Sequence, residues 1–209
     1  SHGWYLKGGK FYLPFGFRLQ DQTAFVRELS GISMTTPDTG VELGLEQPNW
    51  STQLDYSNVI GSASAASRHQ LTAQFTWVKT GYRLGAAASA ASTSAGNRRL
   101  GGLFAGLRSG PLAWLGELDL VRDDGFADGA RTMLAALGEL DWALRRGQNL
   151  KLTAEYQDPD RAVPEDQFTR WSAVYELTPL PFVQLRAGFR RYRGIPQNDL
   201  QNRQSVFVE

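Results

Sequence analysis

The chain has 209 residues, of which 22 are basic and 21 acidic. The resulting net charge of +1 gives no bulk attraction for nucleic acid. Cysteine is absent and histidine occurs twice, which excludes disulfides, thiolate catalysis, c-type haem attachment and a histidine-rich metal site. No apolar run approaches the roughly 18 residues that a transmembrane helix requires, and the length fits a single domain over residues 1–209.

Apolar and polar side chains alternate with a period of two along the whole chain, which predicts β-strands. In LKLTAEYQD, for example, Leu152 and Tyr156 lie on an apolar face, whereas Lys151 and Glu155 lie on a polar one. In chain order, the predicted strands are 10–19, 41–46, 50–58, 70–77, 82–92, 100–108, 112–120, 133–145, 150–158, 169–177, 183–190 and 205–209.

Two of these segments need interpretation. RTMLAALGELDWALRR also has the apolar spacing of a helix, but the strand is favoured because its neighbours on both sides are strands. The alanine-rich segment 82–92 has small side chains on both faces, which predicts that another element lies close to it.

The connections alternate between short and long. Short turns are predicted at 46–49, 78–81, 108–111, 145–149 and 177–181, and long loops at 20–40, 58–69, 92–99, 121–130, 157–168 and 191–204. Short periplasmic turns that alternate with longer extracellular loops are typical of outer-membrane barrels. A soluble barrel has no reason to keep its long loops at one end.

The tryptophans provide an independent indication of a membrane. Five of the six lie on the apolar face of a predicted strand, near a strand end: Trp50, Trp77, Trp114 and Trp142 at the short-turn end, and Trp171 at the long-loop end. Amphipathic rings favour the headgroup level of a bilayer, so these residues are predicted to form the membrane girdles. The apolar strand faces are then predicted to contact lipid, and the polar faces to line a lumen.

Three phrases, GGKFYLPFGFRL, GVELGLEQPNWSTQLDYSN and YELTPLPFVQLRAGFRRYRG, are similar to those of Gram-negative outer-membrane proteins of the porin type, among poorly characterised proteobacterial barrels. The resemblance implies an all-β, transmembrane, antiparallel up-and-down β-barrel in the bacterial outer membrane. About twelve strands belong to this chain, and the barrel is either complete or part of a larger one. Porin-like barrels usually end on an aromatic residue, so we expect the protein to continue past Glu209.

The predicted lumen carries acids and bases in equal measure, which argues against a strong single-sign field. Its charged lining includes Glu117, Asp119, Glu139, Asp141, Lys151, Glu155, Arg170, Glu176, Arg186 and Arg190. His69 with Ser67 could indicate a hydrolase site and VRDDGFADG a calcium loop, but neither has the required partners or spacing. The sequence therefore predicts no enzyme, no cofactor and no metal site.

Two functions fit this pattern. The first is a porin-like channel for passive or weakly selective diffusion of small solutes. The second is a structural sheath that holds a periplasmic or lumenal partner protein, such as a multihaem cytochrome in an electron-transfer conduit. Loop 20–40 is rich in apolar residues such as Phe25 and Leu29, so it is expected either to fold into the barrel or to bind a partner. An inward fold would let Arg27 and Glu28 meet the charges inside.

Overall fold

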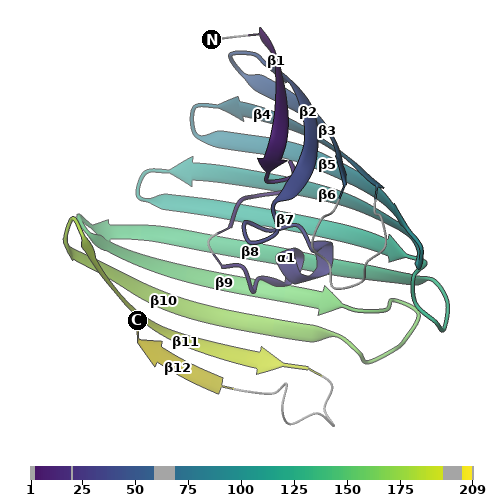
Figure 1. Cartoon of the computed structure of the whole chain (residues 1–209). Helices are drawn as coiled ribbons and strands as arrows, with labels where there is room; N and C mark the ends of the chain where they lie inside the picture. The colour runs from purple at the N-terminus through teal and green to yellow at the C-terminus, as the bar shows by residue number, and fades with distance from the viewer. Residues whose placement is uncertain (1–2, 20, 59–68, 195–203, 209) are drawn as a thin grey trace.

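In the computed structural model, which describes residues 3–19, 21–58, 69–194 and 204–208, twelve antiparallel strands form one sheet (Figure 1). Each strand pairs with the next one in the chain, so the topology is up-and-down. The strands are β1 (Gly3–Phe11), β2 (Asp38–Glu46), β3 (Trp50–Asn58), β4 (His69–Lys79), β5 (Tyr82–Thr93), β6 (Gly96–Ser109), β7 (Leu112–Asp123), β8 (Arg131–Arg145), β9 (Gln148–Asp158), β10 (Phe168–Leu180), β11 (Val183–Arg193) and β12 (Gln204–Val208). A six-residue helix, α1 (Phe25–Ser30), lies between β1 and β2.

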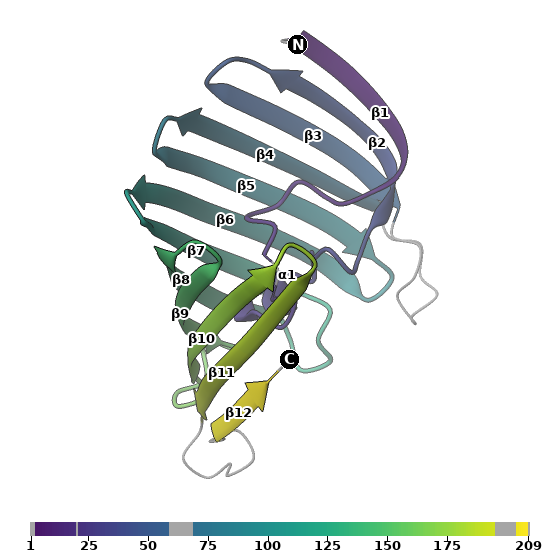
Figure 2. The same ribbon diagram turned by 90° about the vertical axis from the view of Figure 1, so that its left-hand side faces the viewer.

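The sheet is strongly curved, and α1 lies on its concave side (Figure 2). β1 and β12 are the edge strands, and no pairing joins them among the described residues. Within the same part of the chain, no helix is long and apolar enough to cross a membrane.

Burial on the sheet is the reverse of that in a soluble protein. On β7, Leu118 and Leu120 point to the convex side and are 46% and 44% exposed. Glu117 and Asp119, between and beside them, point to the concave side and are 4% and 0% exposed. An apolar outer face and a polar inner face are the properties of a transmembrane barrel, and the predicted apolar and polar faces lie on the convex and concave sides of the sheet.

Two predictions about segments 92–99 and 133–145 have opposite outcomes. The ambiguous segment is a strand, β8, as the sequence predicts. The expected long loop at 92–99 is wrong, because only residues 94 and 95 separate β5 from β6. The hydroxyl of Thr93 accepts hydrogen bonds from the backbone N–H groups of Ala95 (3.1 Å) and Gly96 (3.3 Å), and this local bonding closes the reversal within a few residues.

The first strand is also displaced from its prediction. β1 ends at Phe11, whereas a strand over 10–19 was expected. Residues 12–19 leave the sheet because Pro14 has no N–H for a strand ladder and Gly16 adopts a left-handed φ of 63°. The alternation of LPFGFRL survives, but its apolar side chains are buried on the concave side instead of facing lipid.

The hydrophobic core lies on the concave side of the barrel wall. It combines apolar residues of the segment between β1 and β2 with inward residues of β5–β8. Its members are Leu13, Phe15, Phe17, Leu19, Ala24, Phe25, Val26, Leu29, Ile32, Ala87, Leu100, Phe104, Val121, Met133, Ala135 and Leu137. Part of the lumen is therefore dry.

Adjacent residues on β9 test the two faces. Leu152 points to lipid and is 40% exposed, whereas Thr153 lines an internal cavity. We expect Leu152→Arg to destabilise the barrel in bilayers by about 2–4 kcal/mol, the cost of a lipid-facing cation near the midplane. Thr153→Arg should cost much less, because its guanidinium can remain hydrated. Denaturant titration of refolding into liposomes measures both, and equal tolerance would contradict the assignment.

Candidate functional site

The described residues between β1 and β2, 12–19 and 21–37, form an inward segment that we call the plug. It runs from the end of β1 into the concave side and returns to β2, and α1 contacts β7, β8 and β9 (Figure 1). Phe25, Val26 and Leu29 of α1 are each less than 10% exposed. Of the two expectations for this apolar loop, the inward fold is the one that the structure shows.

The inner wall formed by β5–β8 packs closely against the plug. Phe17 of the plug meets Phe104 of β6 edge to face, with ring centroids 4.9 Å apart. The guanidinium of Arg83 lies 5.5 Å and 5.4 Å from these two rings. Ala87, in the alanine-rich strand, belongs to the same buried cluster, so the predicted close approach of another element to that strand is confirmed. Small wall residues leave room for the large plug residues.

Arg27 is the first polar attachment of the plug. Its guanidinium forms a buried ion pair with Glu117 of β7 and lies 3.8 Å from Asp119. The same group donates hydrogen bonds to the carbonyls of Phe15 (3.2 Å) and Ile32 (3.3 Å), while Glu117 accepts one from the Phe17 N–H (3.0 Å). Charges buried this deeply are costly without partners. The ion pair therefore favours the position of the plug in which Arg27 meets Glu117 of β7.

Arg98 of β6 makes the second attachment. Its guanidinium donates to the carbonyls of Leu29 and Ser30 (3.1 Å) at the end of α1, and it also forms an ion pair with Asp123 (3.3 Å). The last carbonyls of a helix lack intrahelical partners and carry partial negative charge, so a cation there is favourable.

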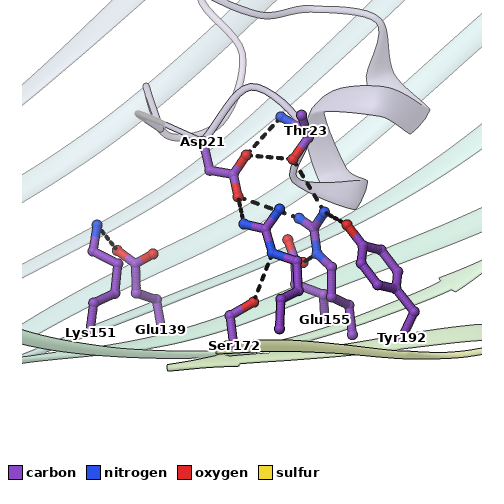
Figure 3. A network of polar contacts seen from close by, with 9 residues as sticks. Asp21, Thr23, Glu139, Lys151, Glu155, Ser172 and Tyr192 are labelled. Atoms are coloured by element: carbon purple, nitrogen blue, oxygen red, sulfur yellow. Dashed lines mark hydrogen bonds and ion pairs between the residues drawn. The ribbon is translucent and has the colours of Figure 1, made fainter. Parts of the chain in front are cut away.

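The third attachment, which we call the latch, consists of Asp21, Thr23, Glu155, Arg170 and Arg190 (Figure 3). The carboxylate of Asp21 accepts a hydrogen bond from Arg190 (2.8 Å) and lies 3.6 Å from Arg170. Arg170 also pairs with Glu155 and donates to the hydroxyl of Thr23 (3.2 Å). The latch thus connects the plug to β9, β10 and β11, on the side away from Arg98.

The surroundings of the Asp21 carboxyl favour its ionised form. Burial alone would raise its pKa, but hydrogen bonds from Thr23 and the charges of Arg170 and Arg190 outweigh burial and hold the pKa below the usual 3.8. At neutral pH the carboxylate of Asp21 therefore keeps its negative charge.

A cavity of about 550 Å³ lies between the plug and the inner faces of β7–β12. Its charged lining contains four bases and four acids: Arg18, Lys151, Arg186, Arg190, Asp21, Glu139, Glu155 and Glu176. Neighbouring strands pair these charges, with Lys151 3.6 Å from Glu139 and 3.9 Å from Asp141, and Arg186 3.1 Å from Glu176. The cavity is polar and electrically balanced.

The structure places the residues predicted to line the lumen on the concave face, but in three different settings. Glu117 and Asp119 are covered by the plug, whereas Glu155, Arg170 and Arg190 belong to the latch. The others, Glu139, Asp141, Lys151, Glu176 and Arg186, lie at the cavity. The tryptophans predicted as membrane girdles lie on the convex face and are exposed: Trp50, Trp77, Trp114, Trp142 and Trp171.

Several functional residues were missed from the sequence. Asp21 and Arg98 attach the plug, and nothing in their local pattern indicates a partner more than 60 residues away. The apolar inner wall could have been found, because inward positions of β6–β8 carry large apolar residues such as Phe104, Val121 and Met133 although the outward positions are apolar too. Apolar residues on both faces of a membrane strand indicate an internal partner.

The residues considered for a hydrolase site and for a calcium loop make other contacts in the fold. His69 is exposed and its ring Nδ1 shares a hydrogen bond with the hydroxyl of Tyr56 (2.9 Å), while Ser67 lies outside the described residues. In VRDDGFADG, Asp123 and Asp124 pair with arginines Arg98 and Arg122. No group of three or more metal-binding side chains occurs in the described part of the chain.

Comparison with solved structures shows the fold. The chain is similar to the structure titled "Outer-membrane expressed OmpT of Vibrio cholerae", with a TM-score of 0.66 and 10% sequence identity, over 93% of this chain and 69% of that one. No protein-family model matches the sequence. No curated protein matches it either. The fold is that of an outer-membrane β-barrel, in agreement with the predicted location in the bacterial outer membrane.

The likeness also corrects one prediction. The sequence was interpreted as not encoding an enzyme, partly because a membrane barrel without a recognisable constellation was taken for a passive structure. One fold hosts unrelated functions, catalysis among them, so the shared fold with OmpT removes that ground for exclusion. The exclusion of an enzyme was therefore wrong.

Gly16 provides a test of the plug. Its φ is 63°, and a Cβ there would overlap the Glu117 carboxylate and lie 2.6 Å from the Arg27 guanidinium. We expect Gly16→Ala to destabilise plug docking by about 1–3 kcal/mol and to raise proteolysis of the plug in the intact membrane. The control is Gly8→Ala on β1, where a Cβ would have no heavy atom within 4 Å. Equal protease resistance of both variants would contradict the docking.

The latch predicts an acid-sensitive plug. Because the pKa of Asp21 is lower in the folded state than its usual 3.8, its stabilising contribution is complete above that pH and disappears as the pH falls through the folded value. Hydrogen exchange at residues 21–24 should therefore accelerate below about pH 3.8 relative to the intrinsic rate. In Asp21→Asn the exchange should be faster throughout and should lose this step. A step that persists in Asp21→Asn would assign it to another group.

Proposed function

We propose that this chain forms a porin-like outer-membrane channel for passive, weakly selective diffusion of small polar solutes, narrowed by its own plug. The observation that carries the proposal is the charge-balanced cavity of about 550 Å³ beside a firmly attached plug. A cavity of this size accommodates small solutes, and paired charges of both signs favour neither cations nor anions strongly.

The other inner walls support the same proposal. The inner faces of β4 and β5 carry amide and hydroxyl groups that bond to one another: Gln70 donates to Ser89 (2.9 Å), and Thr72 and Ser89 share a hydrogen bond of 2.9 Å. Neutral, mutually satisfied groups hold solutes weakly. Weak binding suits a diffusion channel, because a solute must leave as easily as it enters.

The sheath remains the competing proposal, and the plug distinguishes the two. The apolar inner wall of β5–β8 is covered by the chain's own plug, so a lumenal partner would have to bind the charged cavity. Such an interface would be polar, whereas stable protein interfaces have an apolar centre. This favours the channel.

Planar-bilayer recording of the protein tests the proposal. We expect ohmic single-channel conductance and a reversal potential near zero in a KCl gradient, because the lining is charge-balanced. Glu139→Gln with Glu176→Gln removes two acids and should shift the reversal potential toward anions. Lys151→Gln with Arg186→Gln is the matched control and should shift it toward cations.

Each other outcome is informative. A protein that does not conduct but copurifies with a coloured partner supports the sheath and contradicts the channel. Conductance without any shift in either double variant would show that ions do not pass through this cavity.

A further inference from the structure

Basic side chains on the convex face gather at one rim of the barrel. The outward column of β7 begins with Trp114, continues with Leu118 and Leu120, and ends on Arg122 at the rim where β7 meets its long connection to β8 (right-hand side of Figure 1). The column thus passes from an aromatic ring through an aliphatic band to a cation. Such an order follows the polarity of a membrane from one interface to the other.

The column on β6 ends in the same way, and the two cations face each other. Arg99 and Arg122 are directly paired across β6 and β7, and both are exposed. Side chains directly opposite on an antiparallel pair lie about 4.5–5.5 Å apart at Cβ, and like charges there are destabilising. Such a pair is favourable when an anion lies between the two guanidinium groups.

The charges within the protein do not supply that anion in full. Arg122 lies 3.5 Å from Asp124, but both side chains are highly exposed, at 64% and 41%, and exposed pairs are weak. For Arg99, no ion pair is found within the described residues. The two cations therefore keep most of their capacity to bind an external anion.

Other outward positions at the same rim also carry positively charged side chains. They are Lys10 on β1 and Arg191 and Arg193 on β11, all exposed. Among the described strands, an acidic residue at an outward register position there is Asp158, and it is 7% exposed. At the opposite rim, the outward faces end mostly on aromatic and aliphatic residues such as Trp77, Trp114 and Trp142, and the exposed bases there are fewer, with Lys79 beside Trp77 and Arg145 opposite Gln148.

We propose that Arg99 and Arg122 bind the phosphate group of an anionic lipid in the leaflet on the long-loop side. Arginine recognises phosphate through paired, charge-assisted hydrogen bonds, and two guanidinium groups can hold one phosphate from both sides. The place selects a lipid, because the pair lies on the convex face next to exposed Leu103 and Leu120, where acyl chains pack. A second copy of the chain would present the same positive rim and be repelled.

Native mass spectrometry of the protein released from vesicles tests the proposal. The vesicles contain phosphatidylcholine with a minor fraction of phosphatidic acid, whose phosphate monoester is the probe. We expect preferential retention of phosphatidic acid by the unchanged protein. Arg99→Gln with Arg122→Gln should weaken it roughly tenfold, in line with the loss of charge-assisted hydrogen bonds. Lys79→Gln, at the opposite rim, is the control and should retain it.

A second variant protects the test against misfolding. Arg99→Lys with Arg122→Lys keeps both charges but loses the paired geometry, so it should fold and retain an intermediate amount. Equal retention by the Gln variant and the unchanged protein would overturn the proposal, as would equal loss in Lys79→Gln. Complete displacement of the lipid by inorganic phosphate at the same concentration would assign the site to a free anion and would also overturn it.

Discussion

A membrane strand gives its apolar face to lipid, and this constraint determines the rest of the structure. The inner face cannot turn to a second sheet for its partners, so every buried group there must be satisfied by the wall, by water or by a segment that enters the lumen. In this chain the entering segment is the plug. Its Arg27 ion pair with Glu117 joins a buried charge on each side, and neither is stable without the other.

The plug divides the lumen into two environments. Toward β5–β8 it forms a dry core, in which Phe17 and Phe104 pack as they would in a soluble protein. Toward β9–β11 it ends in the latch, where Asp21 meets Arg170 and Arg190 at the edge of the polar cavity. Apolar packing on one side and ion pairs on the other hold the same segment, so the plug is apolar where it packs on the wall and polar where it borders the cavity.

Paired charges serve different purposes on the two faces. Inside, Lys151 with Glu139 and Arg186 with Glu176 neutralise one another across neighbouring strands, which leaves the proposed passage without a dominant sign. Outside, Arg99 and Arg122 oppose each other with like charge. The two inner pairs find their partners within the chain, whereas the outer pair has only the exposed Asp124 nearby among the described residues, and the membrane is the surrounding at that position.

The sequence by itself determined most of the strands, their apolar and polar faces and the membrane class, because a period of two is local and repeats along the chain, and tryptophans mark the ends of several strands. It also indicated that the loop after the first strand either folds inward or binds a partner, since Phe25 and Leu29 are too apolar for a solvent loop. Only the tertiary structure decided where that loop binds. LPFGFRL has the alternation of a strand, and its departure from the sheet depends on an apolar wall assembled from β5–β8. The contacts of Asp21 with Arg190 and of Arg98 with α1 join residues far apart in the chain, so their pairing depends on the curvature and register of the whole sheet, which no local pattern encodes.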